Sequence, residues 1–181
     1  FIGKYSLIKV CSGVIKGEDT LYNPTKDADE KPGKIYVLQG GKPIEVPELH
    51  AGDIGAIAKL NTVATGDTLS TRTTPVVFGK TEISVPYTCK RYKTVNKGDE
   101  DKVSQALSRM MQEDQTLRIE NDSANRQTLM YGIGEQHLDI VCSKLKERYK
   151  VDIVLSKPKV PFRETIRKKA DVDAKYKKQS G

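Results

Sequence analysis

The sequence predicts a multidomain β and α+β protein, in which a small β-barrel is followed by a ferredoxin-like β-α-β-β-α-β domain. Short strand-like runs separated by glycine turns fill residues 1–74. A proline-bracketed linker covers 75–85, and the hydrophobic period then alternates between strand and helix over 86–157. At 181 residues, the chain is long enough for two domains that each bury a core.

The first region shows the even spacing of short strands that is typical of a small barrel. "KYSLIKVCSGVIKGEDTLYN" (4–23) predicts two strands around Ser12-Gly13, with a further turn at Lys16-Gly17. "KIYVLQGGKPIEV" (34–46) and "AGDIGAIAKL" (51–60) add more strands, and "TGDTLSTRTTP" (65–75) is expected to close the barrel. We expect the barrel to be N-terminally truncated here, with its first strand before Phe1.

The second region begins with "YTCKRY" (87–92), a strand for which Pro86 is a suitable start. "TLRIEND" (116–122), "QTLMYGI" (127–133) and "VDIVL" (151–155) predict the other three strands. Two helices alternate with them, because apolar residues recur on one helical face in each. These residues are Val103, Ala106, Leu107, Met110 and Met111 in the first helix, and Leu138, Val141, Cys142, Leu145 and Tyr149 in the second.

The stretch "GIGEQH" (132–137) joins a predicted strand to a predicted helix. A dinucleotide fingerprint needs glycine at 137, where His137 stands, so the glycines predict a sharp turn rather than a cofactor site. Glu135 and His137 are two residues apart, whereas metal ligands on a helix are spaced by three or four. We therefore interpret Glu135 as a first-turn carboxylate and His137 as a hydrogen-bonded interface or core histidine.

Other patterns that carry chemistry are absent from the sequence. There is no phosphate-binding G-x-x-x-x-G-K-[ST] loop, no G-x-S-x-G elbow and no Cys/His pair suited to nucleophilic catalysis. We therefore predict no catalytic residue, cofactor or metal in this sequence. The three widely spaced cysteines indicate a reducing cytoplasm rather than a disulfide framework, and no apolar run is long enough to span a membrane.

The net positive charge of +7 lies almost wholly in the last segment, 157–181, which has nine basic and three acidic residues. This segment is the candidate contact for a polyanion such as RNA, and a solvated strand face is the open alternative. The basic candidates are Arg163, Arg167, Lys168, Lys169, Lys175, Lys177 and Lys178.

Several of these stretches together resemble the elongation factor G family of translational GTPases. The resemblance is carried by "EDQTLRIE", "QTLMYGIGEQHLDIVCSKLKERYKVDI" and "PKVPFRETIRK", and upstream by "GKYSLIKVCSGVIKGEDTLYN" and "AGDIGAIAKL". It covers essentially the whole chain. It implies that 1–74 are most of domain II, a translation-factor barrel, that 86–157 are domain III, and that 158–181 are a connector and the start of domain IV, its first strand.

The resemblance also implies a function. The parent protein would be a monomeric, cytoplasmic, ribosome-dependent GTPase that contacts ribosomal RNA and a small-subunit protein. GTP and Mg²⁺ would bind in a GTPase domain outside this sequence, and the present domains would relay its state to the ribosome-contacting tip. Residues Gly132, Gly134, Glu135, His137 and Leu138 would face that GTPase domain.

Two positions depart from the family pattern. Gln136 replaces the usual leucine, and Gln115 replaces the proline of Glu-Asp-Pro-Thr. These changes favour a diverged paralogue, so translocation, ribosome recycling and ribosome protection all stay open. A non-GTPase RNA-binding or structural module is the alternative from another class.

Overall fold

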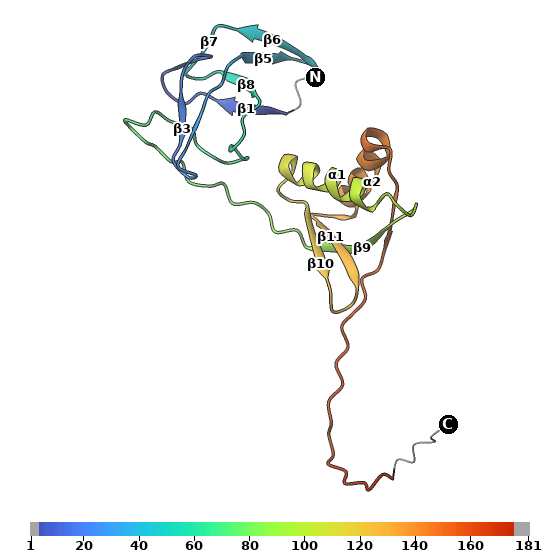
Figure 1. Ribbon diagram of the computed structural model, residues 1–181. Coiled ribbons are helices and arrows are strands. Elements are labelled where there is room, and N and C mark those ends of the chain that lie inside the picture. Colours follow the sequence, from blue (N-terminus) through green and yellow to red (C-terminus); the bar gives the residue numbers. More distant parts are fainter. Residues whose placement is uncertain (1–3, 176–181) are drawn as a thin grey trace, which may run out of the picture.

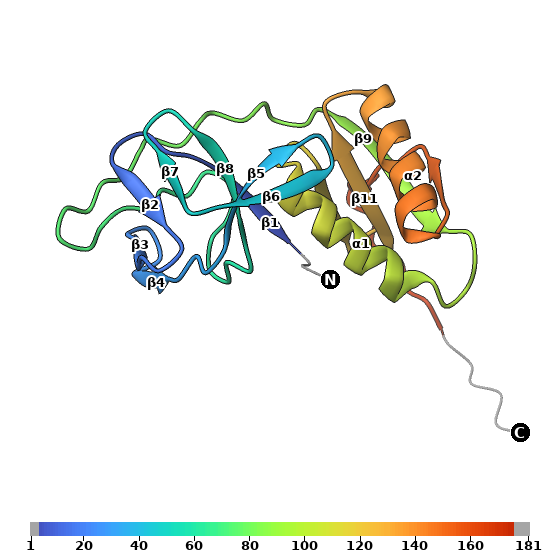
Figure 2. The same cartoon turned by 90° about the horizontal axis from the view of Figure 1, so that it is seen from above.

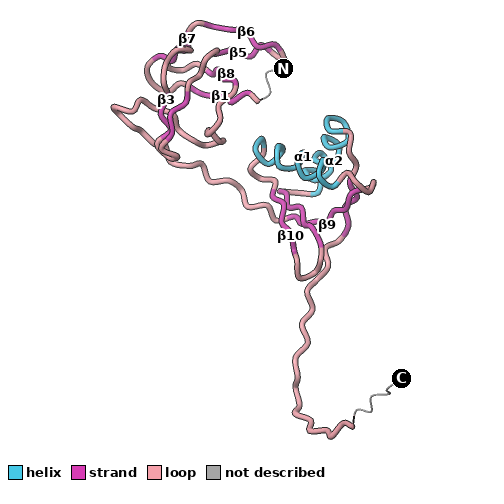
Figure 3. Tube along the Cα trace, viewed as in Figure 1, coloured by secondary structure: helices cyan, strands magenta, loops and turns pink. Residues whose placement is uncertain are grey.

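Two folded domains, joined by a segment without helix or strand, make up the computed structural model, which describes residues 4–175 (Figure 1). Within those residues the first domain contains strands alone, and both helices belong to the second domain (Figure 3). The segment that joins them runs from 71 to 87. Neither helix is long and apolar enough to cross a membrane.

The first domain wraps three small antiparallel sheets around one apolar core, as expected for a barrel. A four-stranded sheet has the order β1 (Tyr5–Lys9), β8 (Ile54–Ala58), β5 (Ile35–Gln39) and β6 (Lys42–Val46). Two two-stranded sheets complete it: β2 (Val14–Lys16) pairs with the distant β7 (Glu48–His50), and β3 (Leu21–Asn23) forms a hairpin with β4 (Ala28–Glu30). The buried core residues are Val10, Leu21, Ile35, Leu49, Ile57, Leu60 and Val63.

The predicted closing strand over 65–75 is wrong. Only Ser70 pairs there, through an isolated bridge to Tyr22. The Asp67 side chain instead accepts hydrogen bonds from the Ala64 amide (2.9 Å) and from Asn23 Nδ2 (3.0 Å). A side chain that bonds the nearby backbone in this way stabilises a turn in place of a strand.

The second domain is a four-stranded antiparallel sheet with both helices on one face, as Figures 1 and 2 show. The strand order is β10-β11-β9-β12, which matches the predicted split βαβ arrangement. The strands are β9 (Thr88–Thr94), β10 (Arg118–Asp122), β11 (Gln127–Gly132) and β12 (Ile153–Ser156). The helices are α1 (Glu100–Glu113) and α2 (Glu135–Tyr149).

The helices form because their apolar stripes meet the sheet. Val103, Ala106, Leu107 and Met110 of α1 are buried, as are Leu138, Val141 and Leu145 of α2. They enclose Met130 of β11, which is fully buried. The predicted helices and stripes are thus confirmed, although Met111, Cys142 and Tyr149 are only partly buried at the edges of the core.

Residues 157–175 contain no helix or strand, so the predicted first strand of a further domain is not formed in the described part of the tail. The apolar side chains Val160, Phe162 and Ile166 are exposed there. A strand needs a hydrogen-bonding neighbour, and no strand among residues 4–175 pairs with this segment, which extends away from the sheet (Figure 1).

Candidate functional site

The loop and first helical turn over residues 132–138, which we call the seam, join β11 to α2. Gly132 is the last residue of β11, and Gly134 is the N-cap of α2. A Cβ atom at Gly132 would lie 2.7 Å from His137 Nδ1 and 2.8 Å from Leu138 Cδ2, so only glycine lets the two side chains approach this backbone. Gly134 is extended, with φ 178° and open space around it, so no close approach requires glycine there.

His137 ties the start of α2 to the end of α1. The Ile133 amide donates to Nδ1 at 3.2 Å, and Nε2 lies 3.0 Å from Asp114 Oδ2. Because Nδ1 accepts, the neutral ring carries its proton on Nε2 and donates it to Asp114. His137 is therefore hydrogen-bonded through both ring nitrogens, where α2 meets the end of α1.

Asp114 holds the other end of this contact as the C-cap of α1. Burial raises the pKa of its carboxyl group, but the hydrogen bonds from Thr116 and the nearby His137 outweigh burial and keep the pKa below its usual value. The Thr116 hydroxyl donates to Asp114 Oδ1 at 2.6 Å and the Thr116 amide at 2.9 Å. Asp114 is thus a carboxylate with both oxygens engaged.

The resulting tautomer of His137 can be tested directly. We expect long-range ¹H–¹⁵N correlation spectra of the neutral imidazole to show the proton on Nε2, because Nδ1 is occupied by the Ile133 amide. In Asp114→Asn the side-chain amide oxygen can still accept the proton of His137 Nε2, so the same tautomer is expected. Asp114→Ala removes this acceptor. A dominant Nδ1–H tautomer in the unmodified chain would contradict the bridge.

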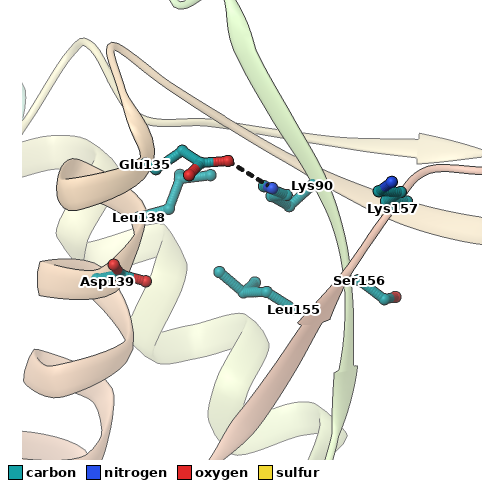
Figure 4. A pocket seen from close by; sticks show the side chains of 7 residues that line it. All are labelled: Lys90, Glu135, Leu138, Asp139, Leu155, Ser156 and Lys157. Carbon is teal, nitrogen blue, oxygen red and sulfur yellow. Dashed lines mark hydrogen bonds and ion pairs between the residues drawn. The ribbon is translucent and has the colours of Figure 1, made fainter.

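Glu135 faces solvent at the N-terminus of α2, where the helix dipole also favours a negative charge. Its Oε1 lies 2.7 Å from Lys90 Nζ on β9. The hydrogen bond and charge of Lys90 hold the pKa of Glu135 below its ordinary value. Figure 4 shows this pair at the rim of an open pocket of about 330 Å³. Leu138, Asp139, Leu155, Ser156 and Lys157 line the rest of it.

The five predicted interface residues do not all reach the surface. Leu138 is 1% exposed and Gly132 is buried, so the prediction that they face a partner is corrected: they shape the seam from beneath. Glu135 is exposed, and His137 and Gly134 are partly so. Ile133 and Ile140, which precede and follow Gln136 in the chain, are also exposed and were not predicted as part of this surface.

Two partners of the seam were also missed. Lys90 and Asp114 lie 45 and 23 residues away from the side chains that they contact. No local spacing signals such pairs. Among residues 4–175, no group of three or more His, Cys, Asp or Glu side chains is arranged to hold a metal ion.

The basic tail leaves the second domain from a fixed point. Gln127 Oε1 accepts from the Lys159 amide at 2.8 Å, and Gln127 Nε2 donates to the Lys159 carbonyl at 3.1 Å. Beyond it, every described basic candidate is exposed, namely Arg163, Arg167, Lys168, Lys169 and Lys175. Lys177 and Lys178 lie outside the described residues.

Comparison with known proteins relates both domains to one family. A family model described as "Elongation factor G domain 2" matches residues 1–72, and one described as "Elongation Factor G, domain III" matches residues 84–157. A crystal structure of a protein from Thermus thermophilus is similar, with a TM-score of 0.78 and 26% sequence identity. The similarity covers 89% of this chain and 24% of that one, so the present chain spans about a quarter of that protein.

Proposed function

The chain belongs to the elongation factor G family, whose second and third domains it spans, and on that premise we propose that it is the central part of a ribosome-dependent translational GTPase. One observation carries the proposal: the two domain matches occur in family order, each over a domain of the expected fold. The parent would work in the cytoplasm on the ribosome, in elongation and translocation. GTP and Mg²⁺ would bind in its GTPase domain, and this chain would carry no catalytic residue.

The seam is the surface that we assign to the GTPase domain. Exposed Glu135, partly exposed His137 and the neighbouring Ile133, Gln136 and Ile140 present a mixed polar and apolar surface. Such a composition suits a contact between domains that forms and separates during a cycle. A displacement of α2 at this point would be transmitted to the end of α1 through the His137–Asp114 hydrogen bond. This is the relay that the proposal requires.

The experiment is nucleotide turnover by the full-length parent with and without ribosomes. We expect GTP hydrolysis to rise when ribosomes are added, and we expect calorimetry to show no GTP binding to the 181-residue chain alone. Ribosome-independent turnover, or none, would contradict the proposal. Tight GTP binding by the chain alone would contradict the assignment of nucleotide to another domain.

The tail provides a second test. We expect Lys168→Glu with Lys169→Glu to weaken binding of the chain to ribosomes and to flatten its salt dependence, because fewer counterions would be released from RNA. The measurement is cosedimentation across a salt series. Lys97→Glu with Lys102→Glu is the matched control, since it makes the same change in net charge at exposed positions of the second domain. Equal slopes for the tail variant and the unmodified chain would leave the tail as a solvated segment.

One observation supports a specialised paralogue. Gln136, which departs from the family pattern, is exposed in the first turn of α2 on the surface assigned to the GTPase domain. A polar residue in place of leucine changes that contact directly. Assays of translocation and of post-termination subunit splitting with the full-length parent distinguish the housekeeping role from recycling. The absence of GTP turnover in both would favour a non-GTPase module.

A further inference from the structure

Two hydrogen bonds join the domains, and both involve Thr65 of the barrel. Gln115 Nε2 donates to the Thr65 carbonyl at 2.8 Å, and the Thr65 hydroxyl donates to the Gln112 carbonyl at 3.2 Å. Within residues 4–175 no other hydrogen bond or ion pair connects the barrel with the ferredoxin-like domain. The relative position of the two domains therefore depends on a contact at one point.

The barrel presents Thr65 on a firmly held turn. Gly66 has φ +88°, the conformation that glycine favours at the third position of such a turn, and the Asp67 amide donates to the Ala64 carbonyl at 3.1 Å. Asp67 is anchored in turn by an ion pair with Lys26 at 2.9 Å. The Thr65 carbonyl is thus held in a defined direction before it meets the second domain.

The second domain presents Gln115 equally firmly. Gln115 follows the C-cap Asp114, whose carboxylate is bound by Thr116 and by His137 of the seam. The Gln112 carbonyl lies in the last turn of α1, where no intrahelical partner is available, so the Thr65 hydroxyl satisfies it. One unbroken path of contacts therefore runs from His137 through Asp114 and Gln115 to Thr65.

We propose that Gln115 is a positioning residue, whose side-chain amide latches the barrel to the end of α1 and so sets the angle between the two domains. The residues that form the latch, Thr65, Gln112 and Gln115, are all exposed. Such a contact is weak, so one substitution is enough to release it. The latch does not depend on the proposed function, but its role in carrying a signal from the seam to the barrel does.

The sequence offers a ready explanation of why this position matters. The resemblance places proline at 115 in the related pattern, and proline has no side-chain donor. Asp114 has φ −131° and ψ 103°, the extended conformation that a following proline requires. The conformation of Asp114 therefore allows either residue to follow it, and glutamine adds the donor.

Residual dipolar couplings of the isolated 181-residue chain test the latch without ribosomes or nucleotide. We expect the unmodified chain to show one common alignment tensor for both domains. Gln115→Ala and Gln115→Glu should lose the common tensor, because neither side chain can donate to the Thr65 carbonyl. Gln115→Lys should retain it, because the lysine ammonium restores a donor of similar reach.

Gln112→Ala is the matched control, since it removes the same type of side chain three residues away but keeps the carbonyl that Thr65 contacts. It should leave the common tensor intact. The latch is overturned if Gln115→Glu keeps the common tensor, if Gln112→Ala loses it equally, or if the unmodified domains already align independently. Because no step of this experiment involves GTP or ribosomes, its failure is distinguishable from failure of the proposed function.

Discussion

Replacing Leu138 by alanine is expected to lower the free energy of unfolding of the second domain by about 2–5 kcal/mol, the usual cost of a cavity in a well-packed core. Leu138 is 1% exposed and lies in the cluster that α1, α2 and β11 share. Its Cδ2 atom also occupies the space beside Gly132. The measurement is hydrogen exchange of the amides of α1 and α2 under native conditions, which reports this domain separately from the barrel.

The control for Leu138 is Ile140, two residues along the same helix and 54% exposed. Ile140→Ala should change stability by no more than about 0.5 kcal/mol, as is usual for surface substitutions. Under the proposed function it should instead weaken the contact with the GTPase domain. A small effect of Leu138→Ala, or a large stability effect of Ile140→Ala, would contradict this division between core and interface.

Replacing Glu30 by alanine is expected to lower the free energy of unfolding of the barrel by about 2–3 kcal/mol, since buried donors would lose a charged acceptor. Glu30 is 4% exposed at the end of β4. Its Oε1 accepts from the Thr62 hydroxyl at 2.6 Å, from the Thr62 amide at 2.5 Å and from the Asn61 amide at 3.1 Å. Urea unfolding followed at amides of the barrel core measures the loss.

The contribution of Glu30 also depends on pH. Burial raises the pKa of this carboxyl group, but the hydrogen bonds from Thr62 and Asn61 outweigh burial and bring the pKa below its ordinary value of 4.5. A group with a lower pKa in the folded state stabilises it fully above the unfolded value, and loses this contribution as the pH falls through the folded value. The difference in free energy of unfolding between the unmodified chain and Glu30→Gln should therefore become smaller below pH 4.5.

Glu45→Gln is the matched control for Glu30→Gln. Glu45 forms an exposed ion pair with Lys34 at 2.8 Å, and its side chain is 53% exposed. Ion pairs of this kind contribute little, so the control should leave barrel stability nearly unchanged at neutral pH. A gap for Glu30→Gln that stays constant down to about pH 3, well below the ordinary carboxyl pKa, would contradict the role assigned to Glu30. So would a gap no larger than that of Glu45→Gln.

The elements of the second domain could be predicted from the sequence because each has a local signature. The apolar stripe that begins at Val103 and the one that begins at Leu138 have helical periodicity, and each is buried on the predicted face. In the barrel the same reasoning found strands such as β5 and β8. It failed at 65–75, where the Asp67 side chain bonds its own turn, and in the tail, where a strand-like pattern has no neighbour.

The helices and strands of the second domain, their order and the family could thus be predicted from the sequence, since a periodic pattern reports the burial of one face of one element. The partners that the seam contacts could be identified from the folded structure but not from the sequence. The hydrogen bond of His137 to Asp114, the ion pair of Glu135 with Lys90 and the contact of Gln115 with Thr65 join residues 23, 45 and 50 positions apart. Such pairs depend on how sheets and helices pack in space. Residues this far apart in the chain show no local sequence pattern that predicts their contact.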